Sequence, residues 1–459
     1  MKRFFMVVAM AFLILSKPIY SQSEAGAIFL LISPGARAGG MGEAQVAVAD
    51  DAYATFWNPA GLAFLKGSEM ALMHVNWLPN LANDMYYEFF AYRKHIPYLG
   101  TVGGHLIYLN LGEQIRMGET PDDYLGTFTS YMMALSLSYS SLLTPKSSLG
   151  INAKISYQHL TEFGAGGEKG KGTSTDFGFD IGYLHKEFLT PRLTMGMTMT
   201  NIGPKVSFID PAQADPQPTN FTLGLNFAIV NSQYNKINLV YDVDKLLVAA
   251  YPDMDWDGDG YVGGFDEFGH KSDKNASYNK DGQQESAHSD PIYIGIFTSW
   301  IDDWLLGGDM DMNGSNDDYD HIIGGYDWND TYGDPDRPGY GNGKIETDEG
   351  EIIPTEGNPG SSGWGSYNEY GQKEVGSAKQ RSIMNELDKL IHNIGVEYWY
   401  GQYFALRAGY LYDKTGKIMN PTFGVGLRFS NYGFDFGYTS GNPKHPLSNT
   451  MRFSLNMEF

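Results

Sequence analysis

The sequence contains no cysteine, which excludes disulfide frameworks, thiolate nucleophiles and cysteine-ligated metals. Charged residues are scarce, at 19% of the 459 residues. After the first residues, the chain also lacks an uninterrupted apolar run long enough for a transmembrane helix. If this protein spans a membrane, it must therefore do so as a closed β-barrel, in which every backbone group finds a partner.

The first residues are typical of a secretory signal peptide. Charged Lys2 and Arg3 precede the apolar run Phe4–Leu15, and small polar residues follow near Ser21. We expect cleavage after Ser21, so residues 1–21 are left out of the fold prediction. A buried N-terminal helix is the alternative interpretation, but no amphipathic pattern accompanies it.

The formal net charge of −22 is concentrated in one part of the chain. Residues 252–391 contain 30 Asp and Glu against 9 Lys and Arg, so the remainder is almost neutral. An acidic segment of this kind repels nucleic acid and anionic lipid and attracts divalent cations. The charge pattern therefore argues against a nucleic-acid partner.

Short segments with an apolar residue at every second position recur along the chain. At the C-terminus, Met451, Phe453 and Leu455 alternate with polar residues up to Phe459. This pattern predicts strands with one face toward lipid and the other toward a polar lumen. The remaining segments run at about 68–78, 85–94, 99–111, 128–140, 148–160, 175–187, 192–201, 221–227, 236–249, 292–300, 393–400, 403–412, 423–429 and 434–439.

These fifteen or so segments predict an all-β fold, a transmembrane antiparallel barrel of about fourteen strands, because barrels of this kind close with an even number. Aromatic residues near the segment ends, such as Tyr86, Tyr108 and Trp399, are typical of the girdles at the membrane interfaces. A soluble sandwich or propeller is the alternative. We assign residues 67–459 to the barrel and place the acidic insert at about 251–391 on the extracellular side, where the long loops of such barrels lie.

The chain also lacks the common catalytic motifs. It has no His-Glu-x-x-His pair and no Gly-x-Ser-x-Gly elbow, and the glycine-rich stretch 164–172 lacks the Lys-Ser/Thr ending of a phosphate-binding loop. We therefore expect that the protein is not an enzyme. A Ser and a His brought together from distant strands, as in barrel-type lipases, remain the alternative.

One stretch of the acidic insert has the spacing of a calcium-binding loop. Oxygen ligands stand at loop positions 1, 3, 5 and 12, a backbone carbonyl at position 7 and Gly260 at position 6. Position 12 is Asp where hand-type loops usually carry Glu, which resembles the dockerin variant. We predict a structural calcium site, with an acidic solvated turn as the alternative; its ligands are Asp255, Asp257, Asp259, Tyr261 and Asp266.

Two further stretches of the insert are weaker calcium candidates because their spacing is imperfect. One comprises Asn342 and Glu349, preceded by Asp334 and Asp336 across an irregular insertion. The other contains Asp309, Asp311 and Asn313. Without a cation, so many carboxylates close together would repel one another, so calcium is the cofactor that we expect.

Residues 22–66 differ in character from every predicted strand. The stretch 33–63 is rich in Gly and Ala, which permit close backbone packing, and Asp50 and Asp51 can cap a short helix that Pro59 would end. This composition predicts a compact hatch inside the barrel, with a surface arm as the alternative. Its motif residues are Gly35, Arg37, Gly40, Gly42, Asp50, Asp51, Trp57, Asn58, Pro59 and Gly61.

The same stretch, GARAGGMGEAQVAVADDA followed by WNPAGLA, closely resembles the opening of the PorV/PorQ family of outer-membrane barrels, which are similar to the FadL fatty-acid transporters. The resemblance implies a fourteen-stranded barrel with an N-terminal hatch. The terminal Phe459 resembles the insertion signal of outer-membrane proteins, whereas the acidic insert departs from the compact loops expected of the family.

The resemblance also implies a function and partners. PorV-like members belong to the type IX secretion system of Bacteroidota-type bacteria, where they bind the C-terminal signal domain of exported cargo. They collect it from the translocon barrel and pass it to the surface attachment complex. A FadL-like transporter of hydrophobic small molecules is the alternative, and a paralogue that only occupies the envelope is another. The motif carries over no cargo-binding residue.

Overall fold

The computed structural model describes residues 25–117, 124–161, 172–208, 214–251, 288–302, 321–324, 372–375, 383–441 and 446–459. The predicted signal peptide lies outside these residues. The chain divides into two compact units, one of residues 24–248, 291–293 and 388–459, and one that holds most of the insert.

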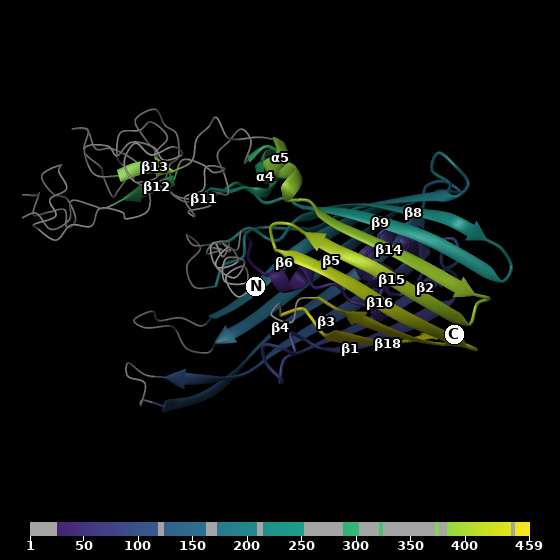
Figure 1. The fold of residues 1–459 in the computed structure, drawn as a ribbon, viewed down its shortest axis with the longest axis horizontal. Coiled ribbons are helices and arrows are strands. Elements are labelled where there is room, and N and C mark those ends of the chain that lie inside the picture. The colour runs from purple at the N-terminus through teal and green to yellow at the C-terminus, as the bar shows by residue number, and fades with distance from the viewer. Residues whose placement is uncertain are drawn as a thin grey trace, which may run out of the picture. The chain divides into compact units, whose positions relative to one another are not determined.

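The first unit is a closed barrel of fourteen antiparallel strands (Figure 1). β9 pairs with β14, although the insert separates the two strands in the sequence. β1 pairs with β18 and closes the ring. The predicted barrel is therefore confirmed, and the sandwich and propeller alternatives are wrong. The strands are β1 Ser68–Asn76, β2 Tyr86–Ile96, β3 Gly100–Met117, β4 Tyr124–Leu142, β5 Ser147–Thr161, β6 Gly172–His185, β7 Leu193–Ile202, β8 Asn220–Asn231, β9 Asn235–Leu246, β14 Ile391–Tyr400, β15 Phe404–Asp413, β16 Ile418–Phe429, β17 Tyr432–Thr439 and β18 Thr450–Glu458.

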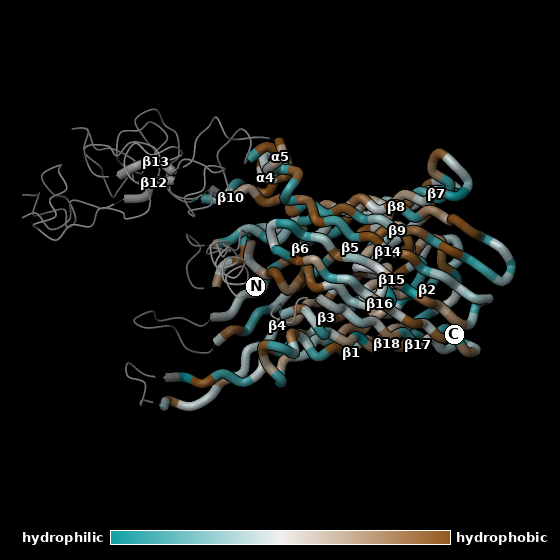
Figure 2. Tube along the Cα trace, in the orientation of Figure 1, coloured by the Kyte–Doolittle hydropathy of each residue, from teal (hydrophilic) through white to brown (hydrophobic). Residues whose placement is uncertain are grey.

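The two faces of the barrel wall differ in polarity, as the alternation predicts. In β18, Met451 and Phe453 are exposed on the outer face, whereas Arg452 and Ser454 are buried on the inner face. Hydrophobic and hydrophilic residues accordingly succeed each other along the strands in Figure 2. Of the described helices, none is long and apolar enough to cross a membrane.

The connections differ at the two ends of the barrel. At one end, which we call the short-turn end, the connections such as 97–99 and 401–403 have at most seven residues. At the other, the long-connection end, the chain forms the connections 203–219 and 440–449 and also leaves the barrel for the insert. All connections of one end lie together because neighbouring strands are antiparallel.

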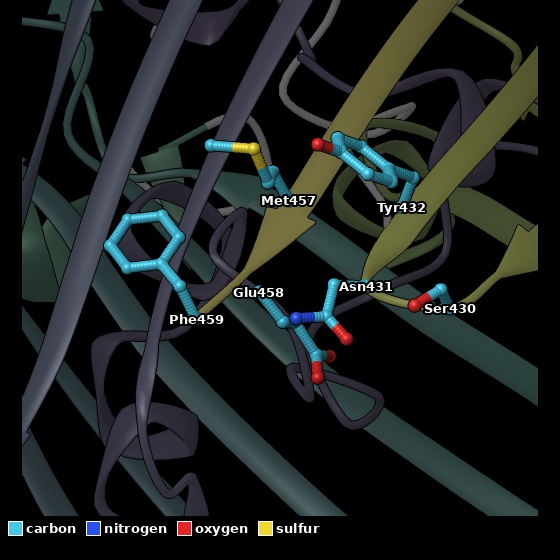
Figure 3. A pocket seen from close by; sticks show the side chains of 6 residues that line it. All are labelled: Ser430, Asn431, Tyr432, Met457, Glu458 and Phe459. Carbon is cyan, nitrogen blue, oxygen red and sulfur yellow. The ribbon is translucent and has the colours of Figure 1, made fainter.

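The C-terminus lies at the short-turn end. Phe459 exchanges two backbone hydrogen bonds with Ser68, at 2.9 and 3.0 Å, which ties the last strand to the first. Its ring stacks on Tyr92, with a centroid distance of 6.3 Å. A shallow surface pocket beside it is lined by the β16–β17 turn and the end of β18 (Figure 3), namely Ser430, Asn431, Tyr432, Met457, Glu458 and Phe459.

The strand predicted at 292–300 is wrong, because Ile292–Thr298 is the helix α4. A short apolar run does not distinguish a strand from a buried helix segment. The Thr298 hydroxyl donates to the Ile294 carbonyl one turn earlier and to the Asp290 carboxylate, at 3.3 and 2.6 Å. The described residues of the insert also form two strand pairs and the helix α5; these elements are β10 Ala250–Tyr251, β11 His288–Ser289, β12 His321–Gly324, β13 Gln372–Val375 and α5 Ile383–Asp388.

Candidate functional site in the barrel lumen

The N-terminal segment, which we define as residues 25–66, runs through the lumen from one end of the barrel to the other. Gly26 donates its N–H to the Pro216 carbonyl in the β7–β8 connection, at the long-connection end. The segment then enters β1 at Ser68, at the short-turn end. It contains four short helices, which are η1 Ile28–Leu31, α2 Ala36–Gly39, α3 Ala54–Trp57 and η2 Pro59–Phe64.

A buried ion cluster centred on Arg37 joins this segment to the barrel wall. The Arg37 guanidinium donates from Nε and Nη2 to the two oxygens of Glu397 in β14, at 2.8 and 2.9 Å. Its Nη1 donates to Asp50 and Asp51 within the segment. Such two-pronged arginine–carboxylate pairs are strong and fix the relative orientation of the two groups. Arg37 therefore holds α2 against β14 and the Asp50–Asp51 turn against α2.

The wall side of this cluster extends across the four strands β14–β17. Glu397 also accepts from Nε of Arg407 in β15, at 2.9 Å. Arg407 in turn donates from Nη1 to Asp435 in β17, at 2.8 Å, and Arg428 donates to the same carboxylate. Opposite charges thus alternate from Arg37 into the wall, so each buried charge has a partner.

The Asp51 carboxylate organises the turn that follows the cluster. Its Oδ1 accepts from the backbone N–H of Tyr53 at 2.9 Å, which starts the turn that leads into α3. Burial raises the pKa of this carboxyl and the neighbouring Arg37 guanidinium lowers it, so that the pKa is raised overall to about 7. Around neutral pH, the charge on Asp51 therefore depends on its arginine partner.

Asn58 and Trp57 fix the second half of the segment. Asn58 Nδ2 donates to the carbonyls of Val46 and Tyr183, both at 3.1 Å, and so joins the segment to itself and to β6. Its Oδ1 accepts from the N–H of Ala60 at 3.1 Å and caps η2, whose first residue is Pro59. The Trp57 indole donates to the Pro34 carbonyl at 3.0 Å. These contacts explain why the Trp-Asn-Pro motif needs these three side chains.

Further polar side chains of the wall bind the backbone of the segment. Asp242 in β9 accepts from two successive N–H groups, those of Gln45 and Val46, at 2.7 and 2.8 Å. Ser148 in β5 donates to the Ala60 carbonyl at 2.7 Å. Because buried backbone groups need partners, the wall supplies them where the segment has no regular secondary structure. Other such contacts come from Ser454, Thr422, Ser140 and Asn152.

Glycines on the inner face of the wall leave room for the segment. They lie opposite each other on neighbouring strands as cross-strand pairs, in which an added Cβ would meet the segment at 3 Å or less. Each pair seats a different part of the segment. The pairs, which we call glycine seats, are Gly150–Gly182 under Asn58–Ala60, Gly196–Gly224 under Val46–Ala47, Gly395–Gly409 under Met41–Gly42, and Gly424–Gly437 under Gly40 and Ala36.

Glycines of the segment itself meet the same steric requirement. Gly35 and Gly42 adopt φ values of 98° and 65°, which a side chain disfavours. A Cβ on Gly40 would lie 2.8 Å from the Gly424 backbone, and one on Gly61 would lie 2.1 Å from the Ala49 carbonyl oxygen. The glycines of the motif therefore serve close backbone approach and tight turns.

An apolar cluster lies on the inner face of β1–β3. Tyr53 stacks on Phe89 of β2 with ring centroids 5.2 Å apart, and Phe56 meets the same ring edge-on at 6.2 Å. Phe29 and Val206 belong to the same buried cluster. The segment is thus held by apolar packing on this side of the lumen and by ion pairs on the side of β14–β17.

The sequence does not reveal the wall residues of this site. Glu397, Arg407, Asp435 and Asp242 are far from the N-terminal motif in the chain. The sequence pattern that could have indicated them is a charged residue at an inner-face position of a strand whose outer face is apolar. The predicted calcium ligands Asp255, Asp257, Asp259, Tyr261, Asp266, Asn342, Glu349, Asp309, Asp311 and Asn313 lie outside the described residues. Within the described residues, no group of three or more His, Asp or Glu could hold a metal ion.

Comparisons with known proteins identify similar chains. A family model described as "Type IX secretion system protein PorV" matches residues 21–253. No curated protein matches the chain. Among solved structures, the toluene transporter TbuX of Ralstonia pickettii is 12% identical, with a TM-score of 0.41 over 94% of this chain and 100% of that chain.

Two further solved structures show similarity of the same order. The toluene transporter TodX of Pseudomonas putida is 12% identical, with a TM-score of 0.42 over 92% of this chain and 96% of that one. A FadL homologue of Pseudomonas aeruginosa is 10% identical, with a TM-score of 0.37 over 93% and 98% of the two chains. Similarity at this level does not extend to what these proteins transport.

Proposed function

Because the chain belongs to the PorV family of type IX secretion system proteins, we propose that this outer-membrane barrel receives exported cargo by its C-terminal signal domain. It then passes the cargo to the surface attachment machinery. In this role the protein is a non-enzymatic carrier, and its partners are the translocon, the attachment complex and the cargo.

The occupied lumen is the observation that supports a carrier. Ion pairs, hydrogen bonds and glycine seats hold residues 25–66 against the wall on strands from β4 round to β18. A polypeptide cannot be threaded through a bore that is already packed in this way. We propose that the segment is a hatch that keeps the barrel closed while cargo binds at the long-connection end, on the extracellular side.

Copurification tests this proposal. The tagged protein is extracted from its own outer membrane in mild detergent, and associated proteins and lipids are identified by mass spectrometry. We expect large secretion proteins and cargo, and we expect cargo without its C-terminal signal domain to be lost. Recovery of a hydrophobic small molecule without protein partners would instead favour the transporter alternative.

We further propose that the insert binds calcium through Asp255, Asp257, Asp259, Tyr261 and Asp266, because their spacing provides the required oxygen ligands. Extracellular sites of this class bind at about 10⁻⁴–10⁻³ M. Millimolar calcium should therefore protect the insert from protease in the native protein, and Asp255→Ala with Asp259→Ala should remove this protection.

A matched control removes the same charge outside the loop, by Asp273→Ala with Asp281→Ala. This variant should keep the protection. Cleavage of the native protein at the same rate with calcium and with chelator would contradict the calcium proposal.

A further inference from the structure

Strand β6 extends beyond its neighbour β7 at the long-connection end. The last pair between them joins Phe179 to Ile202, the final residue of β7. In contrast, β6 continues to pair with β5 back to Gly172. The part of β6 at 172–178, which we call the β6 edge, therefore has a strand partner on one side only among the described residues.

β7 ends early because Asn201 turns the chain into the lumen. Asn201 has a φ of 57°, and its N–H donates to Asp180 at 2.8 Å. Its Oδ1 accepts from the Lys154 ammonium at 2.6 Å, and its Nδ2 donates to the Pro218 carbonyl at 3.1 Å. Asn201 is thus fixed by a buried ion pair of β5 and β6, and the connection that follows it folds inward instead of continuing the sheet.

Among its described residues, this connection meets the β6 edge at Phe177 and Gly178. Val206, 1% exposed, pairs with Asp215 and packs on the N-terminal segment near Gly26. A Cβ on Gly203 would lie 2.3 Å from the Phe177 carbonyl oxygen, and the Gln217 side chain donates to the same carbonyl at 2.9 Å. The backbone N–H and C=O groups of Phe177 therefore point to the side of β6 that is opposite β5.

Residues two apart in a strand direct their N–H and C=O groups to the same side. Thr173 and Thr175 consequently share the orientation of Phe177. No described residue accepts or donates to their backbone on this side. An edge of this kind is a template for another strand.

The β6 edge lies at the level of the membrane interface. A row of aromatic and histidine side chains crosses the outer face of β1–β5, with consecutive rings 5.0 to 6.3 Å apart. Its last members, Tyr157 and His159, pair directly with Thr175 and Thr173. Such rows mark the interface, so Thr173 and Thr175 lie at the border between lipid and water.

We propose that the β6 edge binds an extended strand of the exported cargo, which adds to the barrel wall as a further strand. A row of N–H and C=O groups at strand spacing is matched by another polypeptide backbone, and lipid cannot match it. The part of the edge at 172–176 spans about 16 Å, which is within the usual length of a strand. Gly172 and Gly178 leave both ends of the edge without side chains. The inference rests on the proposed function and names its docking place.

The test compares two variants at Thr175 in the full-length, detergent-solubilised protein, with a purified cargo C-terminal signal domain of the same organism as the probe. Thr175→Pro removes an N–H that points away from β5, so the β5–β6 ladder is kept. We expect it to weaken binding about tenfold. Thr175→Ala keeps the N–H and should bind like the native protein.

A crosslinking experiment supports the same test without altering the backbone. Because the chain has no cysteine, Thr173→Cys gives a single thiol on the edge. Tyr131→Cys gives one on β4, at a residue that pairs with Asn110 of β3 and His159 of β5. Crosslinks to the signal domain are expected from position 173 and not from position 131.

The outcomes separate this inference from the proposed function. Equal binding by the native protein and both Thr175 variants, with no crosslink at 173, would overturn the edge as the docking place and leave cargo binding intact. Failure of the native protein to bind any signal domain would overturn both. Disulfide-linked dimers of the Thr173→Cys variant without cargo would overturn it too, because they would show that a second copy occupies the edge.

Discussion

Replacing Arg37 with methionine should release the N-terminal segment and turn a closed barrel into a conducting one. The substitution leaves the buried Asp51 without its cation, and Glu397 loses two of its three arginine hydrogen bonds. Removing one partner from a buried ion pair costs about 3–5 kcal/mol. The fraction of molecules with a displaced segment should therefore rise more than about a hundredfold.

Conductance in planar lipid bilayers measures this effect, and protease cleavage within residues 25–66 measures it independently. Arg192→Met, at an exposed arginine of the β6–β7 turn, is the matched control and should remain closed. Adding Glu397→Gln to Arg37→Met removes a buried charge that has lost one of its two arginine partners, and should restore part of the closure. Unchanged conductance and protease resistance of Arg37→Met would show that the ion cluster does not hold the segment.

The sequence predicts the barrel well because its signal is local. An outer-membrane strand needs an apolar residue at every second position, and that pattern is visible within about ten residues. It identifies the fourteen strands and adds one error, at Ile292–Thr298, where a short apolar run forms a helix. A helix could not be distinguished from a strand here, because an apolar run this short shows neither the period of a helix nor that of a strand.

The partners of Arg37 could not be predicted because they depend on closure of the ring. Glu397 is 360 residues away in the chain and reaches Arg37 only when β14 pairs with β9. The strand pattern predicts that the Glu397 side chain faces the lumen, but it does not predict the position of Glu397 along the barrel axis. The glycine seats left a clearer signal, because Gly395, Gly409 and Gly424 occupy inner positions of strands that are otherwise rich in large residues.

These seats lead to the second large effect, which is expected from Gly409→Ala. The added Cβ would lie 2.1 Å from the Gly42 nitrogen and 2.2 Å from the Met41 carbonyl carbon. Both are backbone atoms, so a rotamer change cannot relieve the contact. Overpacking costs about 1–3 kcal/mol where side chains can adjust, and we expect at least the upper value here. The segment should be displaced, with increased conductance.

Ala408→Val is the control for this variant, because residue 408 is exposed on the opposite face of the same strand and the added bulk points away from the segment. The thermal midpoint of barrel unfolding, read from gel mobility after heating, distinguishes two causes. If Gly409→Ala only damaged β15, the midpoint would fall while the bilayer conductance stayed at the native level. A seat for the segment requires the conductance to rise in Gly409→Ala and not in Ala408→Val, because only the first alters the surface on which Met41 and Gly42 rest.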